Sequence, residues 1–390
     1  MKKILALLLA ALLVFCMAAC SKSEEEETKE EENVIAVDVS TTVAAGTFSY
    51  APNDEGDYEI TAFVPATLDL VDVTLPKTTE DGRDIVGIKA DAFKTKLTIK
   101  TVTIPDTYVY ISDYAFYGCD NLEKITMADS VTTLGKGAFQ KCIKLADVVM
   151  SKNVTELPVD AFSGCVALKT IDLSGATKKI NAGAFFGCAE LTSVTLSDNV
   201  QYVSTYAFTK ADKLGYAVEN GAKYLGNSAN VYLVLVAPEN LNIETCTVND
   251  NTKVIADRAF AYCSYLETVI LGKNVTCING TCFENDPAYD GLFAEGATIP
   301  ELNITYNVKD SGMYLGTEDN PYMVLISVDK PAAVEKFKIA ASVKIIADTA
   351  FAECVNLEDI SYEGSQANWD SIIKSANWNH DMSVEVHCAQ

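Results

Sequence analysis

The sequence predicts a solenoid, a fold in which short coils of chain stack on one another. An Ala-Phe pair recurs every 23 residues, the same apolar positions follow each pair, and the pattern returns after two interruptions. A fixed period between about 20 and 50 residues is typical of solenoids, in which each repeat contacts only its neighbours. The phenylalanines that mark the repeats are Phe93, Phe116, Phe139, Phe162, Phe185, Phe208, Phe260, Phe283 and Phe351.

Each repeat contains a helical turn, a strand and a return segment. Apolar residues first occur at helical spacing, as in Phe116, Cys119 and Leu122, which predicts a short helical turn. Residues 125–127 then alternate apolar and polar, which indicates a strand with one buried face. One unit cannot bury its apolar face alone, so the repeats must stack. We expect short parallel strands on the concave face, with the helical turns opposite.

At these residues the chain resembles the BspA-type leucine-rich repeats of bacterial surface proteins. The block A-F-x-G-C-x-x-L and the pattern L-x-x-L-x-L, as in residues 168–173, carry the resemblance, which covers residues 58–390. Two Tyr-Leu-Gly stretches, beginning at Tyr224 and Tyr314, are similar to a β-hairpin insert of such arrays, and the ending from Tyr362 looks like the family's closing cap. The resemblance implies adhesion or ligand binding and does not fix the ligand.

The interruptions and the ends set the expected domain boundaries. The spacing between successive Phe markers widens before Phe260 and again before Phe351, which predicts inserts at about 215–250 and 284–340. A β-rich N-terminal cap is expected over residues 34–75 and the solenoid over 76–390, with a C-terminal cap from about 358.

The N-terminus predicts export and lipidation. Residues 1–19 combine a basic start with an apolar run and small residues, as in a secretory signal peptide. Ala18-Ala19-Cys20 resembles a lipobox, with Met17 where leucine is usual, and this resemblance implies that Cys20 is acylated. The alternative is plain secretion with a free Cys20. Residues 20–33 are strongly acidic and are expected to form a disordered tether.

Composition restricts the partners. The formal net charge of −24 over 390 residues argues against nucleic acid and anionic lipid headgroups. After residue 20 no apolar run reaches the length of a membrane span, so a lipid anchor is the expected membrane contact. These features predict an extracytoplasmic protein, anchored at the bacterial cell surface, with an extracellular protein or glycan as partner.

The cysteines have two interpretations. Six occupy the same position of the repeat block, which fits either a disulfide or metal ladder or a column of buried thiols. We favour buried thiols, because free cysteine is among the most buried residue types and Ala211 fills the position once. The six are Cys119, Cys142, Cys165, Cys188, Cys263 and Cys354. No paired spacing fixes the redox state of Cys246, Cys277, Cys282 or Cys388.

The sequence lacks recognisable catalytic chemistry. The two histidines, His380 and His387, have no metal-ligand spacing, and no nucleophile, metalloprotease or phosphate-loop motif occurs. We therefore expect no catalysis, no cofactor and no metal. The main alternative is a carbohydrate-active enzyme or carbohydrate-capturing subunit, which predicts an acidic cleft with aromatic walls near Trp369 and Trp378. A purely structural surface protein is a further alternative.

The candidate ligand-facing residues are the polar positions between the buried strand residues. In a parallel sheet they form one strip, which can hydrogen-bond an extended peptide or glycan, although polar β-branched residues also simply favour exposed strands. This strand strip consists of Thr101, Thr103, Lys124, Thr126, Asp147, Thr170, Asp172, Ser193 and Thr195. The expected function is binding or adhesion at the cell surface.

Overall fold

The computed structural model describes residues 39–43, 45–278, 280–284, 304–374, 378–380, 382 and 384–389. The predicted signal peptide, Cys20, the acidic tether and residues 285–303 of the second insert lie outside the described residues.

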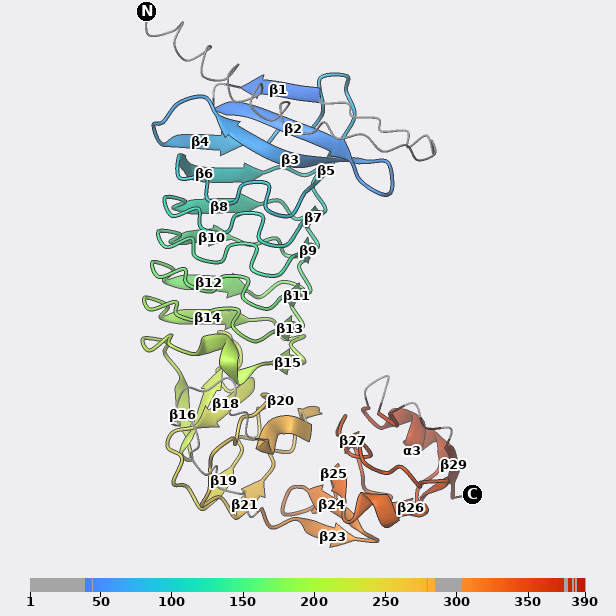
Figure 1. Cartoon of the computed structure of the whole chain (residues 1–390). Helices are drawn as coiled ribbons and strands as arrows, with labels where there is room; N and C mark the ends of the chain where they lie inside the picture. The colour runs from blue at the N-terminus through green and yellow to red at the C-terminus, as the bar shows by residue number, and fades with distance from the viewer. Residues whose placement is uncertain are drawn as a thin grey trace, which may run out of the picture. The chain divides into compact units, whose positions relative to one another are not determined.

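The leucine-rich segments form the first column of parallel strands, which is divided among four sheets; Figure 1 shows the strands between residues 71 and 196 above one another. Its strands are β4 (Val71–Thr74), β6 (Ile99–Ile104), β8 (Lys124–Met127), β10 (Asp147–Val149), β12 (Thr170–Leu173), β14 (Ser193–Leu196), β19 (Thr245–Thr247), β21 (Thr268–Ile270), β26 (Lys336–Ile339), β28 (Asp359–Tyr362) and β29 (Glu385–Cys388). In the regular coils each residue pairs with the residue 23 positions later, as Ile125 does with Val148. The predicted solenoid with parallel, in-register strands is therefore confirmed.

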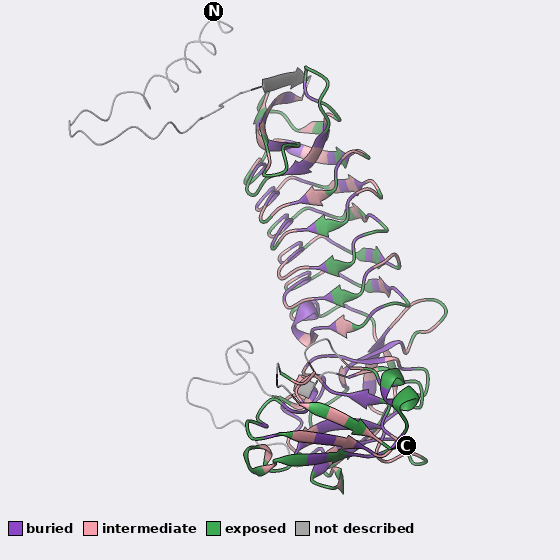
Figure 2. Ribbon diagram, turned by 90° about the vertical axis from the view of Figure 1, so that its right-hand side faces the viewer, coloured by how far each residue is buried: buried purple, intermediate pink, exposed green. Residues whose placement is uncertain are grey.

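A second column of short strands is formed by the return segments. These strands are β5 (Ile85–Ile88), β7 (Tyr110–Ile111), β9 (Thr133–Leu134), β11 (Glu156–Leu157), β13 (Lys179–Ile180), β15 (Tyr202–Val203), β20 (Val254–Ile255), β22 (Cys277–Ile278) and β27 (Ile345–Ile346). From β9 to β13 the first residue is exposed and the second buried, which Figure 2 shows as two-coloured arrows. Even in strands of two residues, one side chain faces the solvent and the next faces the core, as in longer strands.

The segments predicted as helical turns form a third hydrogen-bonded column. Each regular coil directs three backbone N–H groups to the next, as Tyr114, Phe116 and Gly118 do to carbonyls of the following coil at 2.8, 2.8 and 2.9 Å. The residues two before and two after the phenylalanine have positive φ, with values of 55° at Tyr114 and 66° at Gly118. This left-handed conformation ends a helix before it can propagate.

Helix is consequently rare among the described residues. Two of the Phe segments are single turns of 3₁₀ helix, η1 (Thr205–Phe208) and η2 (Gly280–Phe283), and a third such turn is η3 (Pro331–Ala333). The α-helix α3 (Gln366–Ser371) follows the last regular coil, with the Ser365 side chain accepting from the N–H of Asn368 at its N-terminus.

Stacked phenylalanines fill the core. Centroid distances between successive rings from Phe93 to Phe208 are 4.7, 5.4, 5.2, 5.7 and 5.6 Å, and the rings are nearly parallel. Identical residues meet because every coil has the same length. Each ring fills the space between the two strand columns and the turn column, so the aromatic stack is the hydrophobic axis of the array.

The repeat cysteines form a buried column beside these rings. The thiols of Cys119, Cys142, Cys165 and Cys188 donate to the phenylalanine carbonyl of the preceding coil, at 3.0 to 3.2 Å. Burial raises the pKa of the Cys188 thiol to about 12, and it also raises the pKa of the Cys165 thiol. The structural interpretation of the cysteines is supported, since each thiol fills a slot and completes a carbonyl's hydrogen bonding.

The N-terminal residues form an antiparallel cap on the first coil. Strands β1 (Val39–Val43), β2 (Gly46–Pro52) and β3 (Tyr58–Pro65) pair in order, and β3 pairs in parallel with β5. Phe48 and Phe63 lie 6.3 and 5.6 Å from the ring of Phe93. The cap therefore extends the aromatic stack and covers its open end.

Both inserts are three-stranded antiparallel sheets. The first contains β16 (Ala217–Glu219), β17 (Ala222–Leu225) and β18 (Val234–Pro238), and the second contains β23 (Asn307–Lys309), β24 (Gly312–Leu315) and β25 (Val324–Val328). The last strand of each insert joins the second column, because β18 pairs in parallel with β20 and β25 with β27. The predicted β-hairpin inserts are confirmed, and they continue the stack.

Substituting Phe162 by alanine tests the aromatic stack. The ring is fully buried between two other rings, so we expect the free energy of unfolding to fall by about 3–5 kcal/mol, as for other buried phenylalanines. The measurement is urea unfolding followed by circular dichroism.

Phe186 provides the matched control for this substitution, because it follows the stacked Phe185 and its side chain is 36% exposed. Phe186→Ala is expected to change stability by about 1 kcal/mol or less. Equal losses in the two variants would contradict the assignment of Phe162 to the central stack.

Candidate functional site

The structure places the strand strip on one face of the first column. Thr101 pairs with Lys124 and Lys124 with Asp147, while Thr103 pairs with Thr126. In the next sheet Thr170 pairs with Ser193 and Asp172 with Thr195. The strip therefore forms two in-register rows of side chains. Each row is interrupted between β10 and β12, where one hydrogen-bonded sheet ends and the next begins.

The strip is accessible and its charges are partly paired. Thr103, Asp147, Thr170, Asp172 and Ser193 are exposed, and the other four members are half-buried. The Lys124 Nζ lies 2.5 Å from the carboxylate of Asp147. At the top of the strip Thr101 donates to the carboxylate of Asp72 at 2.8 Å. The threonine and serine hydroxyls of the lower part carry the remaining hydrogen-bonding capacity.

The loop of the first insert continues this polar surface. A shallow cavity of about 270 Å³ lies between the strip residues Ser193 and Thr195 and the loop residues Gly226, Asn227 and Ser228. The loop is held against the preceding coil, because Leu196 N–H donates to the Gly226 carbonyl at 3.0 Å. Asn227 also donates to the carboxylate of Asp198 at 3.0 Å.

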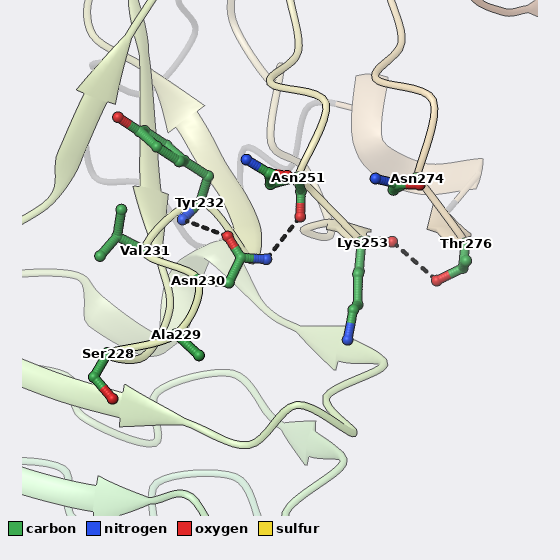
Figure 3. Close-up of a pocket in the computed structure, with 9 residues that line it drawn as sticks. All are labelled: Ser228, Ala229, Asn230, Val231, Tyr232, Asn251, Lys253, Asn274 and Thr276. Carbon is green, nitrogen blue, oxygen red and sulfur yellow. Dashed lines mark hydrogen bonds between the residues drawn. The ribbon is translucent and has the colours of Figure 1, made fainter.

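A larger groove lies on the other side of the same loop. It has a volume of about 610 Å³, and Figure 3 shows Asn230, Asn251, Lys253, Asn274 and Thr276 around it. Its walls are the insert loop and the turns between the strand columns of the next two coils. We call these five residues and Ser228 the amide groove.

Sequence reasoning missed the amide groove. A signal was present, since Asn153, Asn199, Asn251 and Asn274 recur in the turn between the two strands of a repeat. What the period alone does not reveal is that the insert loop bonds to the Asn251 carbonyl and lines one groove together with Asn251 and Asn274.

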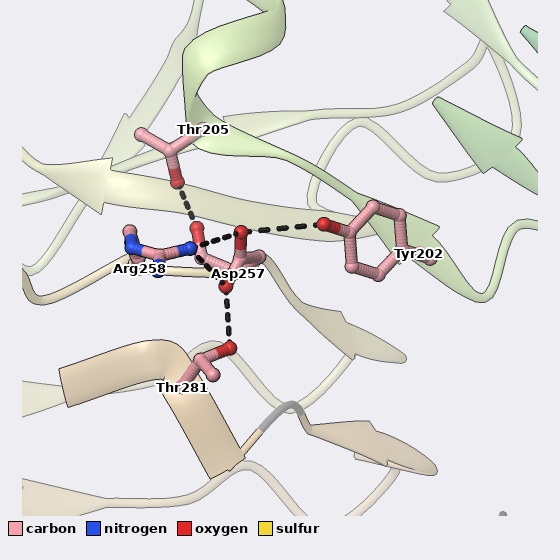
Figure 4. A network of polar contacts seen from close by, with 5 residues as sticks. All are labelled: Tyr202, Thr205, Asp257, Arg258 and Thr281. Atoms are coloured by element: carbon pink, nitrogen blue, oxygen red, sulfur yellow. Dashed lines mark hydrogen bonds and ion pairs between the residues drawn. The ribbon is translucent and has the colours of Figure 1, made fainter. Parts of the chain in front are cut away.

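A buried polar network joins the coils around the first insert (Figure 4). Asp257 is 4% exposed and follows β20, and its carboxylate accepts from Tyr202 at 3.3 Å, from Arg258 at 3.0 Å and from Thr281. Thr205 donates to the Asp257 carbonyl. Burial, with the nearby carboxylate of Asp257, raises the pKa of Tyr202 to about 12. Because Asp257 contacts the coils before and after its own, the network is a structural joint.

The tryptophans and histidines near the C-terminus have structural contacts. Trp369 is 8% exposed and packs on Tyr362 and Trp378, with centroids 5.6 and 5.5 Å away. The ring of His380 hydrogen-bonds the Asp348 carbonyl at 2.7 Å, and that of His387 lies 3.2 Å from the Asp359 carboxylate. The tryptophans thus belong to the core at this end rather than to the walls of an acidic cleft.

Within the described ranges, no cluster of three or more His, Cys, Asp or Glu side chains is arranged to hold a metal ion. In the same part of the chain no helix has the length and apolar character needed to cross a bilayer.

Comparison with known proteins identifies the repeats. The profile of the BspA type leucine rich repeat region matches in six copies, over residues 86–215, 237–309 and 330–376. A search of curated proteins finds no match.

Among solved structures, a leucine rich cell surface protein from Faecalibacterium prausnitzii is 22% identical, with a TM-score of 0.42, over 85% of this chain and 97% of that chain. A leucine rich repeat protein of T. pallidum is 24% identical, with a TM-score of 0.39, over 62% and 89%. At these values the similarity carries no functional argument.

Substituting Asp257 by alanine tests the structural joint. The change removes a buried carboxylate that accepts from three side chains, so we expect a loss of about 3–5 kcal/mol in the free energy of unfolding. Thermal and urea unfolding of the full chain measure it.

Asp250→Ala is the control, because the Asp250–Lys273 ion pair at 2.7 Å is exposed and is expected to contribute about 1 kcal/mol or less. If Asp257→Ala also lowered the free energy of unfolding by only about 1 kcal/mol or less, the network would not be a structural joint between the coils.

Proposed function

Because the chain belongs to the BspA type leucine rich repeat family, we propose that it is a cell-surface binding or adhesion protein. In this proposal the strand strip recognises an extracellular protein or glycan and the chain performs no catalysis. The observation that carries the proposal is the strip itself, an accessible, in-register set of hydroxyl and carboxylate side chains on a stacked sheet.

The geometry of the strip suits an extended partner. Adjacent strands of a sheet lie about 4.8 Å apart, so polar side chains at equivalent positions recur at that distance. Two of the pairs, Thr103 with Thr126 and Thr170 with Ser193, place hydroxyls next to each other. A partner with regularly spaced donors and acceptors can therefore bind several coils at once. Many weak contacts from successive repeats then add to a useful affinity, as in other solenoids that bind along an extended surface.

The family and the N-terminal sequence support a location at the cell surface. The basic and apolar start, the lipobox-like Ala18-Ala19-Cys20 and the acidic segment behind it support a lipid anchor at Cys20. We propose that the anchor and tether hold the solenoid at the bacterial surface, where the strip meets its partner.

A charge change on the strip tests this function. The full chain is applied to arrays of extracellular matrix proteins and glycans, and any ligand found is measured by surface plasmon resonance. The variant Thr126→Lys, Thr170→Lys, Thr195→Lys places three long cations along the strip. We expect at least about tenfold weaker binding, because each substitution removes a hydroxyl and introduces a longer, charged side chain that hinders access to the adjacent strip residues.

The matched control places the same three charges at the second strand column, at Thr133 in β9 and at Thr155 and Gln201 directly before β11 and β15, and all three residues are exposed. Its binding is expected to stay within about threefold of the wild type, a margin typical of residues outside an interface. Ligand binding that both variants retain would place recognition elsewhere, and the absence of any ligand would favour the structural alternative.

A further inference from the structure

The amide groove differs in chemistry from the rest of this acidic chain. None of the nine residues that line the cavity in Figure 3 is an aspartate or glutamate, although the chain has 54 acidic residues and a net charge of −24. Lys253 supplies its positive charge, and three asparagines, a serine and a threonine supply neutral hydrogen-bonding groups. The groove is thus a site that an anionic ligand can approach.

The loop that forms one wall is held in place. Asn230 donates to the Asn251 carbonyl at 2.7 Å and accepts from the Tyr232 N–H at 3.1 Å, as the dashed lines in Figure 3 show. Asn227 accepts from the backbone N–H groups of Ala229 and Asn230 at 3.0 and 2.9 Å. These bonds position the wall before any ligand arrives, which reduces the entropy cost of binding.

The groups that face the groove retain hydrogen-bonding capacity. In the described part of the chain, the side-chain amides of Asn251 and Asn274 make no hydrogen bond. Thr276 donates to the Lys253 carbonyl at 3.3 Å and keeps its oxygen lone pairs. The Lys253 ammonium lies 3.4 Å from the Asp198 carbonyl, and the nearby Asp250 carboxylate is paired with Lys273 at 2.7 Å.

We propose that the amide groove binds a saccharide that carries a carboxylate. Asn251 and Asn274 occupy equivalent positions in adjacent coils, about 4.8 Å apart in a parallel stack, which suits the hydroxyls of neighbouring positions or units of a sugar chain. Each amide offers both a donor and an acceptor, as ring hydroxyls require. Lys253 pairs with the carboxylate in a charge-assisted hydrogen bond.

The fold favours a saccharide over a peptide at this place. A peptide that binds by strand addition needs an unpaired strand edge. The strand nearest the groove, β20, is paired with β18 on one side and with β22 on the other. Strand addition to β20 is therefore excluded, and the polar side chains of the amide groove are amides, hydroxyls and one ammonium.

The second insert provides an internal comparison. Asn320 repeats the bond of Asn230, donating to the Ser342 carbonyl at 2.9 Å, and Lys344 occupies the position of Lys253. Its loop, however, has Glu318 and Asp319 where the first has Ser228 and Ala229. The proposal therefore assigns the saccharide to the first insert alone. It does not depend on the strand strip having a ligand.

Calorimetric titration of the full chain tests the proposal. The two probes are a galacturonic acid trimer and a neutral galactose trimer of the same length. We expect the acidic trimer to bind at least about tenfold more tightly, because it alone pairs with Lys253. Equal affinities, or no binding of the acidic trimer at millimolar concentration, would overturn the proposal.

Three variants assign the binding to the groove. Lys253→Met is expected to abolish the preference for the acidic trimer, whereas Lys344→Met, the matched change in the second insert, should preserve it. Asn274→Ala should weaken the binding of both probes about fivefold, because one hydrogen bond is lost. The Asn274 side chain is exposed, so we expect this variant to fold as the wild type does. Equal effects of the two lysine substitutions would refute the assignment, and thermal unfolding checks that each variant is folded.

Discussion

Backbone hydrogen bonding between coils of equal length is the constraint on which the rest of this structure depends. In each regular coil the N–H groups around the phenylalanine donate to the next coil, and they can do so because the flanking residues adopt positive φ. Together with the two strand columns, this fixes each regular coil at 23 residues, as the pairing of Lys124 with Asp147 and of Thr170 with Ser193 shows. A single insertion within a regular coil would disturb all three ladders, which is consistent with the two inserts being whole antiparallel sheets.

Equal coil length has a consequence for both the core and the surface. Side chains of one kind meet in columns, so phenylalanines stack on phenylalanines and thiols lie beside the carbonyls of the preceding coil. The same rule aligns Lys124 with Asp147 and Thr170 with Ser193 on the outside. A repeat protein of this kind therefore presents in-register rows of side chains, and its recognition surfaces are extended where the array is regular.

Recognition can be more specific where the array is interrupted. The loop of the first insert lies beside the end of the strip on one side and lines a groove with Asn251 and Asn274 on the other. Asp257 maintains the stack there, since it bonds to the coils on both sides. The two inserts share their strand order and a β-bulge. They differ in the charge of the loop, because the first insert has Ser228 and Ala229 where the second has Glu318 and Asp319.

Much of the fold could be predicted from the sequence because the period reports the stacking directly. The core positions, the parallel strands and the two inserts all followed from the spacing of Phe93 to Phe351. The turn conformation did not, because Phe116, Cys119 and Leu122 have the same spacing in a helix and in the observed turns. The glycine two residues after several phenylalanines, as in Gly118, was the available signal. The strip was predicted as a surface, whereas the amide groove was not, since it arises from contacts between an insert loop and coils beyond it.

Amide hydrogen exchange of the full chain, followed by mass spectrometry, tests the central claim most directly. If the turn column is a hydrogen-bonded ladder, the amides of Phe116, Phe139 and Phe162 will exchange as slowly as those of the buried strand residues of the same coils, and they will do so together. Exchange of the phenylalanine amides at the rate of an unstructured peptide, with the strand amides still protected, would contradict the account.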